Sequence, residues 1–317
     1  MIECGHMMAR YVYGVLRPTR FPEAEAHNAL WLGARTLGVE VTEVDLARRC
    51  GLGNIDPQHS GGDVWHAAIE IAIDWQPPPA GAKLVTLRKD ADAVGAMAVL
   101  TARAAGETFA PDARARIELV AAADRFDHGP WPGPRTMPRS AAEVDEVGVG
   151  EQGLGAMIGG LIGADVNHGV AAMRRWLAYG EAPADWLEAA RRAATVLFDR
   201  LRRGEVRARL FDALDIALVE GAAPGALRLG YRLAPIVIAI GEVEGRRKAS
   251  IAQYDRAWVD LPRVAARLNE MEPGWGGSET IIGSPQGLSS RTPVEACIAA
   301  VAACRRHATG AGGRSER

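Results

Sequence analysis

Stretches of apolar residues alternate with helical patterns in the first part of the chain. Residues 11–16 and 83–87 are largely apolar runs bounded by polar or turn residues, which is the pattern of buried strands. Residues 22–37 and 93–105 carry apolar positions at helical spacing, and a glycine follows each segment. A second strand-like segment covers residues 39–44. This alternation predicts an α/β domain with a parallel sheet, in which ligands bind at the carboxyl ends of the strands.

The second part of the chain has a different composition. Charged and apolar residues recur at helical spacing over 186–203, and the helical zone is expected to continue over 206–214. Residues 227–240 and 249–254 are then rich in β-forming residues. The expected fold class is therefore α/β, with a parallel-sheet domain, flanking helices, a helical connector and a smaller C-terminal α/β or α+β domain. The two expected domains are residues 1–205 and residues 206–317.

Charge and cysteine content limit the partners of the protein. The 317 residues include 37 Lys and Arg against 39 Asp and Glu, a formal net charge of -2, so no overall positive field attracts a long nucleic acid. The four cysteines form no Cys-x-x-Cys pair, which is typical of a reducing compartment. Apolar runs stay far below the roughly 20 residues that span a bilayer. We therefore expect a cytoplasmic protein with a small substrate and no membrane partner. A homodimer is possible, but the sequence does not determine the oligomeric state.

The most informative segment runs from Thr86 to Val99. Asp90 and Asp92 flank a single alanine between a predicted strand and a predicted helix. Capping of the helix N-terminus by Asp92 would explain one of the two carboxylates. Two carboxylates at the carboxyl end of a strand can also bind a shared divalent cation. The sequence leaves both interpretations open.

The residues Asp90-Ala-Asp92-Ala-Val-Gly95 resemble the first signature motif of the DHH phosphoesterase superfamily. In that family a strand ends in a histidine, and Asp-x-Asp-(Ala/Gly)-(Ile/Leu)-Gly-Ser follows before a helix. Thr86 stands where the family has its histidine, and Lys89 replaces the usual proline. The resemblance implies a metal-dependent phosphoesterase domain followed by a smaller substrate-binding domain.

Two further segments combine carboxylates with histidine. Asp56 and His59 lie in a glycine-containing loop, and Asp124, Asp127 and His128 follow a predicted helix. Both segments are similar to the Asp-His-His signature of the DHH superfamily, and the sequence does not choose between them. Carboxylate and imidazole together favour manganese, iron or zinc as the bound metal. A solvated helix end is the alternative interpretation of Asp124 and Asp127.

A glycine-rich segment over residues 274–290 resembles the loop of the substrate-binding domain that accompanies DHH domains. Its glycines and hydroxyls, with the N-terminus of a helix that a predicted capping box opens at Thr292, can bind phosphate or carboxylate oxygens. A tight hairpin between a strand and a helix is the alternative. The residues predicted to bind substrate are Gly276, Gly277, Ser278, Gly283, Ser284 and Arg291.

These features lead to one expected function. The protein is predicted to be a phosphohydrolase or phosphodiesterase that acts on a small nucleotide or short oligonucleotide with a metal-activated water. Manganese is the expected ion, one or two per chain, with magnesium, iron or zinc as alternatives. A non-catalytic nucleotide- or anion-binding relative, and a single-metal hydrolase of a non-phosphate substrate, are the alternative functions. The predicted metal ligands are Asp56, His59, Asp90, Asp92, Asp124, Asp127 and His128, and the predicted catalytic residues are Asp90, Asp92, His59, His128, Arg88 and Lys89.

Overall fold

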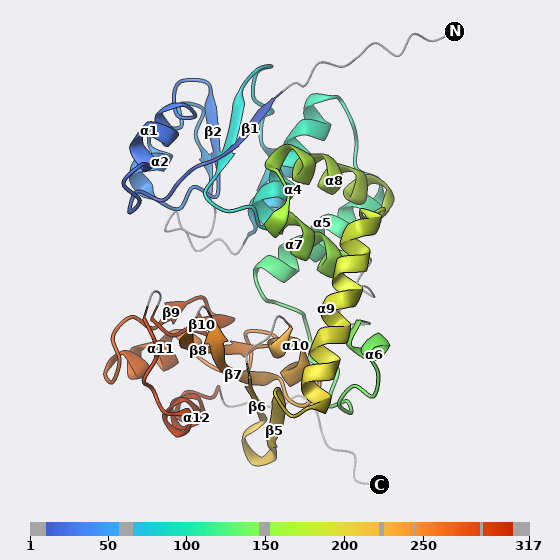
Figure 1. Ribbon diagram of the computed structural model, residues 1–317. Helices are drawn as coiled ribbons and strands as arrows, with labels where there is room; N and C mark the ends of the chain where they lie inside the picture. Colours follow the sequence, from blue (N-terminus) through green and yellow to red (C-terminus); the bar gives the residue numbers. More distant parts are fainter. Residues whose placement is uncertain are drawn as a thin grey trace. The chain divides into compact units, whose positions relative to one another are not determined.

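The chain folds into two compact units (Figure 1). The computed structural model describes residues 11–56, 66–145, 153–221, 225–243, 245–285 and 288–306. Unit 1 comprises residues 1–125 and 148–190, and unit 2 comprises residues 126–147 and 191–317. The sequence-based division after residue 205 differs from this one by the segments 126–147 and 191–205. The predicted fold class, α/β with a parallel sheet and a second, smaller domain, is confirmed.

The described strands of unit 1 form a four-stranded sheet in the order β1-β4-β2-β3, and every pair is parallel. All four strands therefore end at the same edge, where parallel sheets place their ligands. The strands are β1 (Val12–Val15), β2 (Thr36–Val39), β3 (Asn54–Ile55) and β4 (Lys83–Thr86). The helices are α1 (Ala24–Ala29), α2 (Val44–Ala47), α3 (Ala68–Asp74), α4 (Ala91–Ala104), α5 (Pro111–Asp124), α7 (Leu154–Gly163) and α8 (Val166–Tyr179).

Helices cover both faces of the parallel sheet. Neighbouring residues of β4 point to opposite faces, so Leu84 packs in the core with α4 while Val85 packs with Leu46 of α2. Helix α4 is rich in alanine and buried on nearly all sides, because it lies among α3, α5, α7 and α8 (Figure 1). Gly95 lets α3 approach closely, since a Cβ at this position would lie 2.6 Å from Ile69 Cδ1. The start of α4 is thereby held firmly beside α3.

The described strands of unit 2 form a mixed six-stranded sheet in the order β5-β6-β7-β8-β10-β9. One face packs against α11 and α12, and the other packs against α10 and the end of α9. The strands are β5 (Arg207–Phe211), β6 (Ile216–Glu220), β7 (Ile236–Val243), β8 (Arg246–Gln253), β9 (Gly276–Gly277) and β10 (Ile281–Gly283). The helices are α6 (Ala141–Asp145), α9 (Ala184–Arg202), α10 (Ala226–Tyr231), α11 (Leu261–Asn269) and α12 (Val294–Ala303), with a 3-10 turn at Asp212–Leu214. Residues 184–190 of α9 belong to unit 1. None of the described helices has the length and apolar character that crossing a membrane requires.

Four expected elements are corrected by the structure. The helix expected over 22–37 ends at Ala29, and the strand that follows is β2 rather than residues 39–44. All four residues of β2 are buried between two other parallel strands, so tertiary pairing overrides the helical spacing. Residues 206–214 contain β5, which pairs antiparallel with β6, instead of a continued helix. The β-rich segment 227–240 contains most of α10 before β7 begins.

Candidate metal centre

Among the described residues, three carboxylates converge in unit 1. Glu40 directly follows β2, Asp92 lies in the first turn of α4, and Asp124 is the last residue of α5. Each offers a carboxylate oxygen, and these three atoms lie within 4.8 Å of one another. Glu40 is only 6% exposed and Asp92 only 1% exposed, whereas Asp124 is half-buried. The sequence analysis predicted Asp92 and Asp124 as metal ligands but did not single out Glu40.

The backbone of Glu40 is held in an uncommon conformation. Its φ of 53° lies in the left-handed region, which costs a residue with a side chain about 1–3 kcal/mol. The amide of Glu40 donates to the carbonyl of Ile55 at 2.8 Å, so this conformation is fixed at the end of β3. A strained and buried carboxylate at the carboxyl edge of a parallel sheet is typical of a functional residue.

The two aspartates around Ala91 have different partners. Asp90 caps α4, because its Oδ1 accepts from the amide of Ala93 at 2.9 Å. Asp92 turns toward the start of α3, where its Oδ2 accepts from the amide of Ala68 at 2.7 Å and its Oδ1 from that of Ile69 at 2.8 Å. Capping of α4 is therefore provided by Asp90. A carboxylate oxygen accepts more than one hydrogen bond, so each oxygen of Asp92 keeps a lone pair for a cation.

The cluster is electrostatically unfavourable without a positive charge. Burial, followed by the charges of Asp92, Asp90 and Asp124, raises the pKa of Glu40 well above its ordinary value. Burial and the charge of Asp124 likewise raise the pKa of Asp92. A divalent cation among the three side chains would favour their ionised forms. Because all three donors are oxygens, the set fits a hard cation such as magnesium or manganese best.

The nearest positive side chain in sequence is engaged with another acid. Arg125 follows Asp124, and its Nη1 lies 2.5 Å from Oε2 of Glu70. The same Glu70 oxygen accepts from the amide of Ala67 at 2.9 Å, and Nδ1 of His66 lies 3.7 Å away. Glu70 thus ties the beginning of α3 to the end of α5. The two helices that carry Asp124 and the amides for Asp92 are joined by this ion pair.

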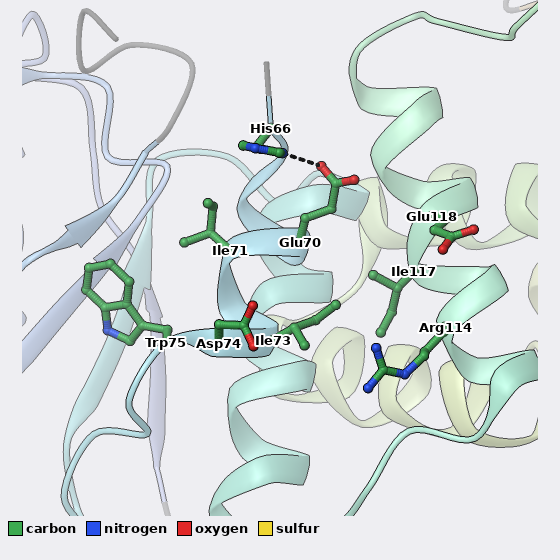
Figure 2. A pocket seen from close by; sticks show the side chains of 9 residues that line it. All are labelled: His66, Glu70, Ile71, Ile73, Asp74, Trp75, Arg114, Ile117 and Glu118. Atoms are coloured by element: carbon green, nitrogen blue, oxygen red, sulfur yellow. Dashed lines mark ion pairs between the residues drawn. The ribbon is translucent and has the colours of Figure 1, made fainter. Parts of the chain in front are cut away.

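A pocket of about 490 Å³ lies beside that ion pair, between α3 and α5 (Figure 2). Ile71, Ile73, Trp75 and Ile117 form its apolar part, and Figure 2 shows the charged side chains arranged around them. The charged residues and the histidine are His66, Glu70, Asp74, Arg114 and Glu118. The three clustered carboxylates do not line this pocket.

The other residues predicted near Asp90 lie in varied environments. The side chain of Arg88 is exposed, whereas Nζ of Lys89 donates to the carbonyl of Ala164 at 2.5 Å. Asp56 is half-buried and directly follows β3. His59 lies outside the described residues.

Asp127 and His128 belong to unit 2 and have local roles there. Oδ1 of Asp127 accepts from the amide of Gly129 at 3.1 Å, which is a turn contact. The ring of His128 packs against Tyr231 and Tyr254. Neither residue is part of the described carboxylate cluster.

The predicted substrate-binding residues form turns and short strands in unit 2. Gly276 and Gly277 make up β9, and Gly283 ends β10. Oγ of Ser278 accepts from the amide of Ile281 at 3.3 Å, and Oγ of Ser284 accepts from that of Ala249 at 3.1 Å. These contacts agree with the hairpin interpretation of the segment.

The chain's own Glu272 occupies the groups that were expected to bind an anion around Arg291. Its carboxylate accepts from the Arg291 amide at 2.7 Å, from Ser290 Oγ at 2.7 Å and from Thr292 Oγ1 at 2.8 Å. Nε1 of Trp275 donates to it at 3.2 Å. Burial opposes ionisation, but these hydrogen bonds outweigh it and lower the pKa of Glu272 to about 2. The predicted capping box is consequently not formed, and Pro293 is the N-cap of α12.

Comparisons with known proteins find similarity among solved structures. No protein-family model and no curated protein matches the chain. Among solved structures, the chain aligns with the pGpG-specific phosphodiesterase PggH from Vibrio cholerae at a TM-score of 0.36 and 13% sequence identity. The alignment covers 78% of this chain and 92% of that chain.

Proposed function

We propose that the protein is a divalent-metal-dependent phosphoesterase that acts on a small nucleotide or short oligonucleotide. The observation that carries the proposal is the buried cluster of Glu40, Asp92 and Asp124. The resemblance of residues Asp90 to Gly95 to a DHH signature motif supports the phosphoester as the substrate class. Asp90, which caps α4 beside this cluster, is assigned a positioning role.

Glu40, Asp92 and Asp124 would hold the cation. When bound, such an ion supplies positive charge for phosphoryl oxygens and lowers the pKa of water. The protein contributes rigidity: the amides of α3 orient both oxygens of Asp92, and the left-handed backbone fixes Glu40. Preorganised ligands of this kind need little rearrangement during a reaction. The exposed Arg88 is the candidate for attracting an anionic substrate, because Lys89 is held by a carbonyl.

A second candidate function is a nucleotide- or anion-binding protein that does not hydrolyse its ligand. One observation favours it. Lys89, one of the predicted catalytic residues, donates to the carbonyl of Ala164, so hydrolysis lacks that cation, whereas binding alone does not require it. Turnover distinguishes this candidate from the first.

The experiment measures metal binding and turnover on the full chain. After chelator treatment, manganese is titrated by calorimetry, and hydrolysis of a generic phosphodiester and of short oligonucleotides is followed. We expect Glu40→Gln and Asp124→Asn to weaken manganese binding by at least about 10–100-fold, the range known even for outer-shell ligands, and to abolish turnover.

The matched control is Glu118→Gln, because Glu118 is an exposed acid on the same helix as Asp124. It should bind manganese and turn over substrate like the parent protein. Manganese affinity that is unchanged in Glu40→Gln and Asp124→Asn would disprove the metal site. Metal binding without hydrolysis of any phosphoester would favour the non-catalytic candidate.

A further inference from the structure

A second pocket lies in unit 2 and takes no part in the proposed metal chemistry. Its volume is about 450 Å³, and the described residues that line it are Pro138, Arg139, Phe198, Leu201 and Arg202. All of them belong to unit 2, whereas the carboxylate cluster lies in unit 1. A volume of this size is within the range of pockets that hold small molecules. The chemistry of the lining therefore decides which molecule fits.

One wall of this pocket is a face of α9. Phe198, Leu201 and Arg202 are three and four positions apart, which places them on the same side of the helix. Leu201 also packs against the core that contains Leu197, so this wall is anchored in the hydrophobic core. Phe198 is half-buried and Arg202 is exposed. A ligand from solvent can therefore contact both side chains without opening the core.

The opposite wall is a loop that hydrogen bonds hold in place. The amide of Arg139 donates to Oε2 of Glu143 at 2.8 Å. Nε of Arg232 donates to the carbonyl of Thr136 at 2.9 Å, and Pro138 between these two contacts is buried. The backbone of Arg139 is thus fixed at the rim of the pocket, while its side chain stays exposed. Both arginines are presented to the same space by ordered backbone.

The charge of the pocket is positive. Arg139 and Arg202 are the ionisable side chains among its described lining residues, and no carboxylate is found there. Of the acids on either side of Arg202, Glu205 pairs with Arg203 at 2.5 Å, and Asp199 acts electrostatically on the same arginine. Two guanidinium groups favour an anion, and their planar shape matches the oxygens of a phosphate group. The pocket therefore disfavours amines and metal cations.

We propose that this pocket binds a nucleoside phosphate, with the base against Phe198 and the phosphate held by Arg139 and Arg202. An inorganic anion would leave the apolar part of the lining uncovered, whereas a base offers a flat face to the aromatic ring. The described lining has no amide or hydroxyl side chain to read the edge of a base, so purines and pyrimidines both fit. A free nucleotide and the end of an oligonucleotide share this chemistry. The site goes beyond the proposed function, because it needs neither metal nor catalysis.

The test measures binding to the full chain by calorimetry, with a chelator present throughout. AMP and UMP are compared with ribose phosphate, which lacks the base, and with hexyl phosphate, whose apolar body has no flat ring. We expect both nucleotides to bind at least about fivefold more tightly than either comparison compound, the value of one stacked base. Their affinity should fall as the salt concentration rises, because the contacts with exposed arginines are screened.

Two variants separate the base contact from the phosphate contact. Phe198→Leu keeps an apolar side chain but removes the flat ring, so AMP should bind at least about fivefold more weakly while hexyl phosphate binds as before. Arg202→Gln should weaken AMP binding about three- to tenfold and reduce its salt dependence. Both residues lie in unit 2, so neither variant should change manganese affinity.

The matched control is Arg191→Gln, since Arg191 is an exposed arginine on the same helix that does not line the pocket. It should leave AMP affinity unchanged. Equal AMP affinity in Arg202→Gln and Arg191→Gln, or hexyl phosphate that binds as tightly as AMP, would overturn the proposal. A short oligonucleotide that binds more tightly than AMP, and more weakly in Phe198→Leu, would assign the site to an oligonucleotide end, whereas equal affinities would assign it to a free nucleotide. Because the chelator removes metal, these results are independent of the manganese titration.

Discussion

Glu40 combines three properties that a carboxylate with a purely structural role rarely shows together. It is buried, its backbone is left-handed, and its oxygens face two other carboxylates. Each property disfavours the folded state in the absence of a cation. A residue that lowers the stability of the folded protein in this way is typically retained for its function.

Replacing the ionisable carboxyl of Glu40 by an amide should therefore stabilise the metal-free protein at pH 7. We expect Glu40→Gln to raise the free energy of unfolding by about 0.5–2 kcal/mol in the presence of chelator, because the raised pKa keeps Glu40 protonated in the metal-free folded protein and glutamine folds without taking up that proton. Adding manganese should then raise the melting temperature of the parent but hardly that of the variant. Thermal unfolding with and without manganese provides the measurement. A variant less stable than the parent in chelator would contradict this explanation.

Substitution of Glu272, unlike that of Glu40, should lower the stability of the protein, and the size of this loss should depend on pH. Its folded-state pKa of about 2 lies below its ordinary value, so its stabilising effect is complete above about pH 4.5 and is lost as the pH falls toward 2. Glu272→Gln should cost about 1–2 kcal/mol at pH 7, a modest value because the side chain is partly exposed. The difference between variant and parent should disappear near pH 2. Denaturant unfolding followed by tryptophan fluorescence tests this, and a difference that persists unchanged at low pH would refute it.

The residues predicted from the sequence were those with strong local signals. Asp92 and Asp124 lie in acidic segments at helix ends, and the structure brings them together. Glu40 gave no such signal, because a single acid after an apolar run is indistinguishable from a surface position. The rule that ligands collect where parallel strands end would have identified it, had β2 been placed at Thr36–Val39. The misplaced helix over 22–37 thus hid the third carboxylate of the cluster.

At the level of secondary structure, α3 and α4 are the pair on which the candidate metal centre depends. The amides at the start of α3 orient Asp92 of α4, and the close packing at Gly95 sets the separation of the two helices. Sequence patterns predicted β4 and α4 well, since a buried strand and an alanine-rich helix have clear signatures. They failed for short elements such as β5, where pairing with a neighbouring strand decides the conformation.

Widening the gap between α3 and α4 should weaken the metal site. In Gly95→Val the added side chain meets Ile69, so we expect a loss of about 1–3 kcal/mol in stability. The amides of Ala68 and Ile69 should move away from Asp92, and manganese affinity should fall with them. Gly159→Val is the control, because Gly159 is an exposed helical glycine with open space at its Cβ position. If Gly95→Val binds manganese as the parent does, the packing at Gly95 is irrelevant to the site.

At the scale of the whole molecule, the two units have separate hydrophobic cores. Buried apolar residues cluster on both faces of the parallel sheet in unit 1 and, separately, on both faces of the mixed sheet in unit 2. Separate cores permit separate unfolding transitions, so two-state behaviour is not expected.

A ligand confined to unit 1 should shift only one of these transitions. At a free concentration 100 times its dissociation constant, manganese should stabilise unit 1 by about 2.7 kcal/mol and leave unit 2 unchanged. Scanning calorimetry of the full chain, with manganese and with chelator, gives the two melting temperatures. Glu272→Gln identifies the transition of unit 2, because it should lower the melting temperature of that unit. Equal shifts of both transitions would show that the units unfold together.

The order of segments along the chain also determines how the protein can be divided. Unit 2 takes residues 126–147 from within unit 1, and Met137 and Val144 of that segment pack against the core that contains Leu197 and Val219. A fragment that ends at residue 190 would carry those apolar side chains without their partners, and a fragment that begins at 191 would lack them. A single cut therefore releases neither unit intact. Each unit would have to be excised as two pieces and rejoined by a new linker before its folding could be studied in isolation.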